Sequence, residues 1–393
     1  MRKLAAQVGT PVYIYSLRRA LNNYHTIKAA FPKAHLHYSV KANGNLAVLR
    51  ALIQHGAGID AVSGGEIHRA LAAGAVPGDI VFAGVGKTTQ EIADAHAQGI
   101  GWFNIENIDE CRLLNVIAGE VGRSARVALR LNPDVSANTI AKINTGHGGA
   151  KFGLSADAVR YLLDNQTDYP HLRFEGLHLH IGSQLGDTNA TAQAIRAALN
   201  VIAPFSNVRT LNIGGGLPVA YAPGSNLPTP ADFAAALLPL IEGYDLILEP
   251  GRSIIADAGI LVARVLYVKP QGEQLFVILD AGMTDLIRPA LYEAHHEILP
   301  VRADEAAPVL HAHIVGPVCE TTDVLASGVP MPGAEPGALV ALMTAGAYGM
   351  VMASNYNARP RPPEVVVSEE GDTWHVARRR ETYADLLAFE VSE

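Results

Sequence analysis

The chain repeats one pattern of hydrophobic and polar positions from about residue 35 to residue 251. Each repeat begins with a run rich in Val, Ile and Leu, continues with Gly or polar residues, and ends in an Ala- and Leu-rich stretch of helical period. Continuous apolar runs are typical of strands covered on both faces, and strands that alternate with helices form parallel sheets. Eight runs occur, at residues 35–40, 58–63, 79–84, 102–106, 126–132, 174–182, 210–216 and 245–251. They predict a (β/α)8 barrel; an open doubly wound sheet is the alternative, but its strand count rarely reaches eight.

After about residue 257 the helical stretches fade and strand-like runs with hairpin signals take over. These runs lie at residues 260–268, 274–282, 310–318, 338–346 and 364–379. They predict a separate β domain with a sandwich or Greek-key-like topology, and the strand-like segment 12–17 is expected to pair with it. The expected domains are therefore a barrel at 18–256 and a β domain made of 1–17 plus 257–393.

Composition narrows the class of protein. With 393 residues, 49% of them apolar, the chain can bury the cores of two domains. The formal net charge is −8 and no run of Lys or Arg is able to track a phosphate backbone, so a small molecule is a better expected partner than nucleic acid. Cys111 and Cys319 are the only cysteines, which suits a reducing compartment. Residues 1–10 lack the apolar run of a signal peptide, so we expect a cytoplasmic protein. Charged residues interrupt every long apolar stretch before it reaches membrane-spanning length, so we expect no membrane segment. We also expect no metal site.

Polar residues gather where the predicted barrel strands end. The carboxyl ends of barrel strands form the active face in enzymes of this fold. We therefore expect the functional site among the polar and glycine residues at these ends, namely Lys41, Asp60, Ser63, Glu106, Asn132, His180, Ser183, Gly214–Gly216 and Glu249.

Three of these features together favour a particular cofactor chemistry. Gly214–Gly216 ends the seventh run, where barrels often bind phosphate, and Ser183 adds a hydroxyl; a plain turn is the alternative for the glycines. Lys41 ends the first run and suits an imine with an aldehyde cofactor, whereas an ion-paired or snorkelling lysine is the alternative. Glu249 ends the eighth run and could keep a pyridine nitrogen protonated. His180 could stack on such a ring or be a packed strand residue.

One further motif is a decoy. Residues 84–89, GVGKTT, are similar to a phosphate-binding P-loop, but that motif requires Gly where this chain has Val81. An ordinary barrel loop is expected there.

The order of these motifs resembles the fold-type III pyridoxal phosphate decarboxylases, and within them the diaminopimelate decarboxylases. The resemblance covers nearly the whole chain. It is carried by YSVKAN (38–43), GIDAVSGGE (58–66), KFG (151–153), HLHIGSQ (178–184), NIGGG (212–216), EPGRSI (249–254), DAGMTDLIRPALY (280–292), GPVCETTD (316–323) and GAYGMVMASNYNARPRP (346–362).

The resemblance implies roles for individual residues. The catalytic residues would be Lys41 as the imine lysine, Cys319 as the proton donor and His180 as the ring-stacking group. The cofactor, pyridoxal 5'-phosphate, would be bound by Lys41, Asp60, His180, Ser183, Gly214, Gly215, Gly216, Glu249, Pro250, Gly251, Arg252 and Tyr348. The substrate would be held by Arg252, Arg288, Tyr292, Glu320 and Tyr348, and two arginines suit a substrate with a distal carboxylate. For Arg288 the alternative is a surface ion pair, and for Cys319 a buried small apolar residue.

The resemblance also implies an activity and an assembly. The activity would be decarboxylation of meso-2,6-diaminopimelate at its D-centre to L-lysine and CO2. The assembly would be a homodimer in which Cys319 reaches the site of the partner subunit. Relatives that act on other or modified amino acids share most of these motifs, so a different substrate is an alternative. A racemase is a second alternative, against which Glu249 argues, because racemases of this type favour a poorly protonated ring nitrogen. A non-catalytic carrier of the cofactor is a third, against which the β domain argues.

Overall fold

The computed structural model describes residues 1–135, 151–302 and 309–391. The chain divides into two compact units. One unit, called here the barrel unit, comprises residues 22–219 and 226–254. The other, called the β unit, comprises residues 1–21, 220–225 and 255–393.

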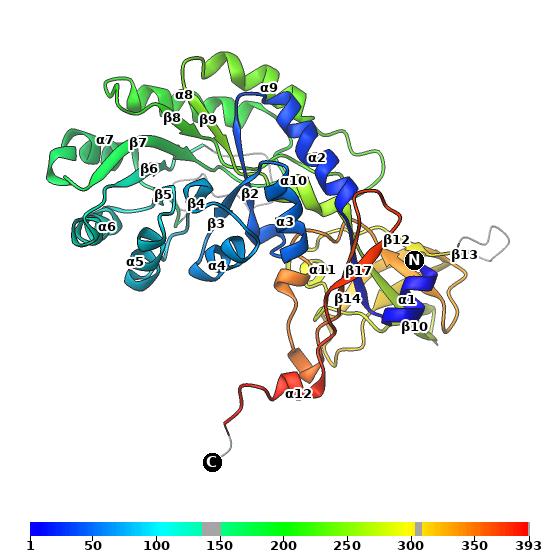
Figure 1. Ribbon diagram of the computed structural model, residues 1–393. Helices are drawn as coiled ribbons and strands as arrows, with labels where there is room; N and C mark the ends of the chain where they lie inside the picture. Colours follow the sequence, from blue (N-terminus) through cyan, green and yellow to red (C-terminus); the bar gives the residue numbers. More distant parts are fainter. Residues whose placement is uncertain (136–150, 303–308, 392–393) are drawn as a thin grey trace. The chain divides into compact units, whose positions relative to one another are not determined.

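The barrel unit is built on eight parallel strands that close on themselves. Each strand pairs with the next along the chain, and β2 pairs with β9 to complete the circle. Figure 1 shows helices lying around the outside of these strands. The predicted (β/α)8 barrel is thereby confirmed, and the open doubly wound sheet is excluded. The strands are β2 (His35–Ser39), β3 (Gly58–Ala61), β4 (Ile80–Phe82), β5 (Trp102–Ile105), β6 (Ala125–Leu131), β7 (Leu172–Leu179), β8 (Thr210–Asn212) and β9 (Asp245–Leu248).

Six of the helices around the barrel begin at polar caps. In each capped helix a Ser, Thr or Asn side chain accepts a hydrogen bond from a backbone N–H of the first turn, which would otherwise lack a partner. Ser63, one of the strand-end polar residues, is such a cap and begins α4. The helices are α2 (Leu17–Ala30), α3 (Leu46–Gln54), α4 (Gly64–Ala72), α5 (Thr89–Gln98), α6 (Ile108–Val121), α7 (Ala156–Asp164), α8 (Asn189–Ile202), α9 (Pro230–Leu237) and α10 (Arg252–Ile255), and the capping side chains are Asn45, Ser63, Thr88, Asn107, Ser155 and Thr229.

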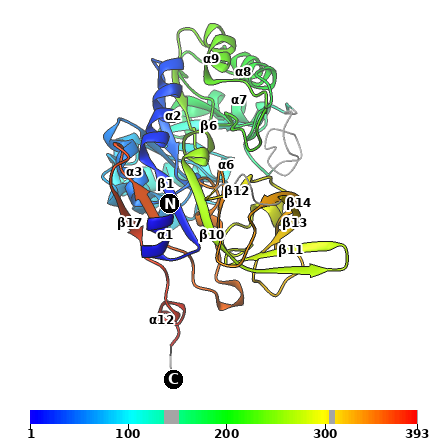
Figure 2. The ribbon, with the colours of Figure 1, turned by 90° about the vertical axis from the view of Figure 1, so that its right-hand side faces the viewer.

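The β unit contains one connected sheet. Its strands run in the order β14-β13-β11-β10-β1-β16-β17, and β15 pairs with both β10 and β12. Figure 2 shows β10 and β11 as a long antiparallel hairpin. The strand predicted near the start of the chain is confirmed as a member of this sheet, because β1 pairs with β10 and β16. The strands are β1 (Val12–Ser16), β10 (Gly259–Gln271), β11 (Gln274–Leu279), β12 (Ile298–Pro300), β13 (Val309–Val315), β14 (Val324–Pro332), β15 (Leu339–Leu342), β16 (Glu364–Val367) and β17 (Trp374–Arg378), with short helices α1 (Arg2–Val8), α11 (Arg288–Tyr292) and α12 (Tyr383–Leu386).

Two of these strands, β12 and β14, were not predicted. The strand β12 has only three residues, and β14 contains Gly328, Pro330 and Pro332, which are residues that weaken a strand pattern. Within the described parts of the chain, no helix combines the length and the apolar character that crossing a bilayer requires.

The entry to β5 depends on a close backbone approach. A Cβ atom placed on Gly101 would lie 1.9 Å from the carbonyl oxygen of Gly78, whereas a Cβ atom on Gly78 would have no heavy atom within 4 Å. Both glycines belong to the same contact, but only Gly101 lacks room for a side chain. Gly78→Ala is therefore a matched control for Gly101→Ala.

We expect Gly101→Ala to lower the free energy of unfolding by about 1–3 kcal/mol, the usual cost of overpacking, because a backbone carbonyl cannot move aside as a side chain can. Gly78→Ala should change it by no more than about 0.5 kcal/mol. Urea unfolding followed by circular dichroism measures both. Equal stability of the two variants would show that the contact does not limit the packing of β5.

Candidate active site

Lys41 lies directly after β2, in a single 3₁₀ turn at Val40–Ala42. Its Nζ is 3.6 Å from Oδ2 of Asp60, which lies in β3 and is fully buried. Asp60 also accepts a 2.6 Å hydrogen bond from the hydroxyl of Ser39. Burial and the charge of Glu249 raise the pKa of Asp60, and the charge of Lys41 counteracts this. Lys41 thus has an anionic partner, yet its side chain is 41% exposed and can be reached by a ligand.

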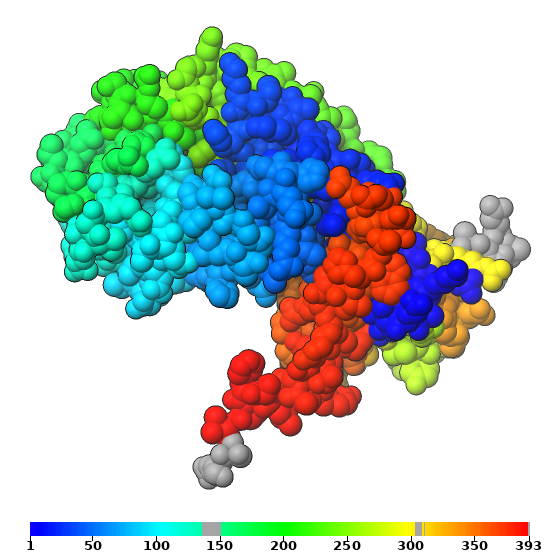
Figure 3. Space-filling model, in the orientation of Figure 1, coloured from blue at the N-terminus to red at the C-terminus, as the bar shows by residue number. Residues whose placement is uncertain are grey.

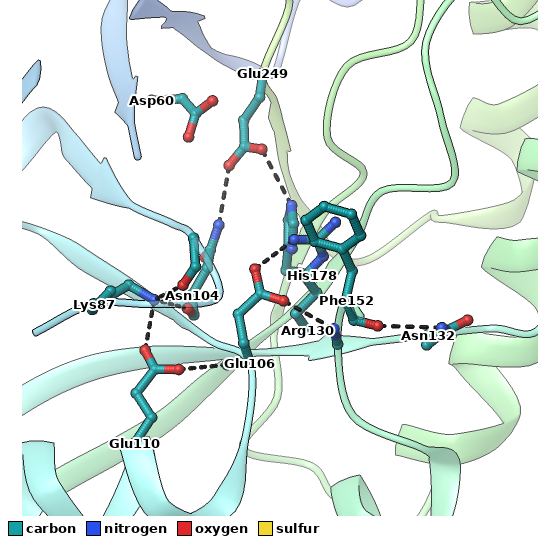
Figure 4. Close-up of polar contacts among 12 residues, drawn as sticks. Asp60, Lys87, Asn104, Glu106, Glu110, Arg130, Asn132, Phe152, His178 and Glu249 are labelled. Atoms are coloured by element: carbon teal, nitrogen blue, oxygen red, sulfur yellow. Dashed lines mark hydrogen bonds and ion pairs between the residues drawn. The ribbon is translucent and has the colours of Figure 1, made fainter. Parts of the chain in front are cut away.

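Glu249 lies at the end of β9, in the middle of a set of hydrogen-bond donors from other strands (Figure 4). Its Oε1 accepts from Nδ2 of Asn212 in β8, at 2.5 Å, and from Nδ2 of Asn104 in β5, at 3.2 Å. Its Oε2 is 3.2 Å from Nε2 of His178 in β7. Burial alone would raise the pKa of Glu249, but the interactions with His178, Lys41 and Asn212 outweigh it and hold the pKa well below its usual value. The carboxylate is therefore ionised and fixed in position.

Three buried polar atoms of this region have no hydrogen-bond partner within the described residues. They are Oδ1 of Asp60, Oδ1 of Asn104 and Nδ1 of His178. An unsatisfied buried polar atom costs about 1–3 kcal/mol, so three within one polar cluster indicate a place where a bound polar group completes the hydrogen bonding. This observation fits a nitrogen-containing ring with polar substituents, as the sequence predicts.

The glycine triplet after β8 has no room for side chains. A Cβ atom on Gly214 would lie 2.6 Å from Nδ1 of His180, one on Gly215 would lie 2.5 Å from the carbonyl oxygen of Glu249, and one on Gly216 would lie 2.8 Å from that of Gly182. Gly214 and Gly216 also have φ angles of 64° and 103°, in the region that favours glycine. The loops after β7, β8 and β9 are therefore in close backbone contact at the place where barrels commonly bind phosphate.

The His180 ring lies against this triplet as a neutral group. The backbone N–H of Gly215 donates to its Nδ1 at 3.3 Å, so Nδ1 carries no proton in this arrangement. Burial, followed by the charges of Lys41 and Arg130, lowers the pKa of His180 well below its usual value. A flat neutral ring is suited to stacking on an aromatic cofactor.

The EPGR turn after β9 packs against β2 and the loop after β7. The carbonyl oxygen of Pro250 accepts from the N–H of Ser39 at 3.2 Å, and a Cβ atom on Gly251 would lie 3.0 Å from that of Ser39. Arg252 donates through Nε to the hydroxyl of Ser183 at 3.1 Å. The turn thus brings Ser183 and Arg252 together at the same end of the barrel as Gly216.

A second polar layer supports the strand ends. Oε1 of Glu106 pairs with Nη1 of Arg130 at 2.5 Å, and Oε2 accepts from the N–H of Gly153 at 2.9 Å. Asn132 donates to the carbonyl oxygen of Phe152 at 3.2 Å. Glu106 and Asn132, both expected at the site, therefore fasten the KFG segment to the barrel wall.

The lysine of the P-loop-like segment GVGKTT (84–89) has a structural role in this second polar layer. Lys87 is buried and donates to Oε1 of Glu110, at 2.6 Å, and to the carbonyl oxygens of Gly84 and Asn104, at 2.9 and 2.7 Å. An ordinary loop was expected there, and the lysine indeed holds the barrel wall together.

Apart from Arg252, which is in the barrel unit, the residues expected to bind the substrate belong to the β unit. Arg288 begins α11 and is buried; its Nη1 is 2.8 Å from Nε2 of His296, and its guanidinium lies 4.6 Å from the centre of the Tyr221 ring. The other ring nitrogen of His296 is 2.8 Å from the carbonyl oxygen of Met343. These contacts fix the guanidinium plane, and the surface ion pair considered for Arg288 is wrong because the residue is buried.

The remaining expected residues of the β unit lie on three segments. Tyr292 ends α11 and is half-buried. Cys319 and Glu320 are exposed on the loop between β13 and β14, where Cys319 donates its N–H to Oδ1 of Asn357 at 3.0 Å. The buried apolar role considered for Cys319 is therefore wrong. Tyr348 follows β15 with a φ of 57°, which is unusual for a bulky residue and marks a constrained site.

Several polar residues of the site were missed by sequence reasoning. Asn104, His178 and Asn212 sit inside short apolar strands, and the signal that could have identified them is a polar residue interrupting a buried run. For His178 and Asn212 this signal is sharper in the structure, because they are paired neighbours in the register of β7 and β8.

Comparison with known proteins agrees with this geometry. Residues 17–256 match the family model described as "Pyridoxal-dependent decarboxylase, pyridoxal binding domain". Diaminopimelate decarboxylase from Aquifex aeolicus is 41% identical over 98% of this chain and 92% of its own length, and that from Pseudomonas aeruginosa is 42% identical over 99% and 95%. The crystal structure of diaminopimelate decarboxylase from Helicobacter pylori, complexed with L-lysine, matches with a TM-score of 0.93 and 36% identity over 99% of this chain and 98% of that one. The chain therefore belongs to the pyridoxal-dependent decarboxylase family, within its diaminopimelate decarboxylase branch.

Proposed function

We propose that this enzyme removes the carboxylate at the D-centre of meso-2,6-diaminopimelate and releases L-lysine and CO2, the last step of lysine biosynthesis. The observation that carries the proposal is the ionised, buried Glu249 in the same barrel end as the accessible amine of Lys41. A fixed carboxylate can keep a pyridine nitrogen protonated, and a protonated ring accepts electrons. The relatives of this chain named diaminopimelate decarboxylase support the choice of substrate.

The residues present fit pyridoxal 5'-phosphate. Lys41 would hold its aldehyde carbon, Glu249 its ring nitrogen, and the neutral His180 its ring face. Its phosphate would be bound by Gly214–Gly216 with Ser183 and the EPGR turn, and Asp60 and Tyr348 complete the proposed set. When bound, the cofactor supplies the electron sink for the pair that the departing carboxylate leaves behind.

The chain's own residues would divide the remaining work. Asp60 would orient the amine of Lys41, which it contacts. The burial of Asp60 and Glu249 excludes water, so that the fixed charges act in a poorly screening environment. Cys319 would return a proton to the substrate, for which its exposed thiol is suited. Cys111 is unsuited, because burial and the nearby Glu110 raise its pKa to about 12.

Specificity would come from the grip on the substrate's distal end. We assign its carboxylate to Arg288 and Arg252, and its ammonium group to Glu320, with Tyr292 and Tyr348 beside them. A guanidinium whose plane is already fixed loses little freedom when it binds a carboxylate in a fork. This supports a substrate with two carboxylates over a simple diamino monocarboxylate.

We further propose that the enzyme works in the cytoplasm as a homodimer whose active sites are shared. Support for a partner subunit comes from the C-terminal segment around α12, which is drawn in red at the surface in Figure 3. Its side chains Tyr383, Leu387 and Phe389 are 77%, 64% and 97% exposed. Exposed apolar side chains in one segment are typical of a surface that another chain covers.

The first test concerns the cofactor. The purified protein should be yellow, and borohydride reduction followed by peptide mapping should find the cofactor on Lys41. Lys87 should remain unlabelled, because its side chain is buried and engaged with Glu110. A label on Lys87 or Lys151 would overturn the assignment.

The second test concerns the substrate. Released CO2, measured over a panel of amino acids, should be greatest with meso-diaminopimelate. Arg288→Ala should raise KM and lower kcat/KM for it at least about tenfold, the scale of one charge-assisted hydrogen bond. Arg288→Lys keeps the positive charge but loses the forked hydrogen-bonding geometry. Its kcat/KM should lie between that of the unmutated enzyme and that of Arg288→Ala. If lysine or ornithine proved the better substrate of the unmutated enzyme, our assignment of the arginines would be wrong.

The third test concerns the shared site. Lys41→Ala and Glu320→Ala should each be inactive, but should restore activity on mixing, because each mixed dimer contains one intact site. Random exchange makes half of the dimers mixed, so recovery should approach roughly a quarter of normal activity. No recovery despite mass-spectrometric proof of mixed dimers would place Glu320 in its own subunit's site or outside catalysis.

A further inference from the structure

His178 is a buried histidine that neither the sequence nor the proposed chemistry uses. It lies in β7, two residues before His180, and is 2% exposed. His178 reaches Glu249, which follows β9, so its side chain faces the interior of the barrel. Its Nε2 is 3.2 Å from Oε2 of Glu249.

The two oxygens of Glu249 have different partners. Both asparagine amides, of Asn104 and Asn212, donate to Oε1. The hydrogen bond of His178 goes to the other oxygen, Oε2. Removing this donor would take a hydrogen bond from a buried, charged oxygen, which favours protonation or reorientation of the carboxylate.

The contact does not depend on the charge of the imidazole. A histidine that donates through Nε2 does so as the neutral ring with its proton on Nε2 and as the imidazolium. The Nδ1 atom is buried and has no hydrogen-bond partner in the described part of the chain. No described group therefore accepts a hydrogen bond from Nδ1, which would favour the tautomer that lacks a proton on Nε2.

The position of His178 is also fixed from both sides. His178 and Asn212 are register partners in β7 and β8, so two donors to the same carboxylate come from adjacent strand positions. On the other side, His178 is the register partner of Arg130 in β6, and Arg130 is paired with Glu106. Figure 4 shows Glu249 with its contacts to Asn104 and His178.

We propose that His178 is a positioning residue, which keeps Glu249 ionised and oriented so that the ring nitrogen of bound pyridoxal phosphate stays protonated. The inference rests on the proposed role of Glu249 at that nitrogen. His178 acts through Glu249 and touches neither the substrate nor the reacting atoms.

The test measures the protonation state of the cofactor's ring nitrogen directly. Protein is loaded with pyridoxal phosphate labelled with ¹⁵N in the ring, and the ¹⁵N chemical shift is measured by solid-state NMR. The unmutated protein should show a protonated ring nitrogen. His178→Phe keeps a flat ring without a donor, and its shift should move more than halfway toward that of an unprotonated pyridine. His178→Gln keeps an N–H donor and should stay near the unmutated shift.

The kinetic constants of the unmutated protein and its His178 variants should follow the same order as their chemical shifts. His178→Phe should lower kcat by about 10- to 100-fold, the scale of one hydrogen bond to a charged group, with a smaller change in KM. His178→Gln should recover most of this loss. A merely structural role would lower activity without moving the ring nitrogen's shift.

Glu249→Gln separates the inference from its foundation. If Glu249→Gln moves the shift and His178→Phe does not, the role of His178 is overturned while that of Glu249 stands. If Glu249→Gln leaves the nitrogen protonated, the proposed role of Glu249 fails and the inference fails with it. In the Glu249→Gln background, His178→Phe should cause no further shift, and an additional shift would contradict action through Glu249. Should His178→Phe not fold or not bind the cofactor, His178→Asn, whose amide is too short to reach Oε2, is expected to give the same shift.

Discussion

The site depends on holding negative charge inside a barrel. Asp60 and Glu249 are both buried carboxylates, and removing such groups from water costs several kcal/mol each unless partners compensate. For Glu249 the partners are side chains of β5, β7 and β8, which are far apart along the chain. Only a closed barrel brings these strand ends around one point. The ionised state of the buried Glu249 carboxylate therefore depends on barrel closure.

The surrounding layer converts this electrostatic arrangement into fixed positions. Lys87 holds the carbonyl of Asn104, whose side chain donates to Glu249, while the Glu106–Arg130 pair fastens the KFG segment. The glycine triplet allows three loops to touch through their backbones without intervening side chains. Preorganised donors of this kind need no reorientation when charge develops in a reaction, which is the usual basis of electrostatic catalysis.

The pattern of the sequence predicts the architecture well, because continuous apolar runs alternating with helical stretches admit few folds. It also identifies Lys41 and Glu249, since a charged residue at the end of a buried strand stands out. It does not identify His178, Asn104 or Asn212, because their importance depends on which strands become neighbours and in which register. Nor does it separate Ser63, a helix cap, or Glu106, an ion-pair partner, from the residues around the cofactor position. At a strand end, capping, packing and catalysis require the same polar residue types.

The pairing of β2 with β9 has a consequence for how the protein folds. His35 and Leu36 pair with Ile247 and Leu248, so the contact that closes the barrel joins residues far apart along the chain. Contacts of such long sequence separation form slowly, because a large loop must close before they contribute. Lys41 follows the first of these strands and Glu249 the last, and no half of the barrel carries both. Tight binding of the cofactor therefore requires the closed barrel. Because the cofactor binds tightly only to the closed barrel, it shifts the folding equilibrium toward that state by mass action.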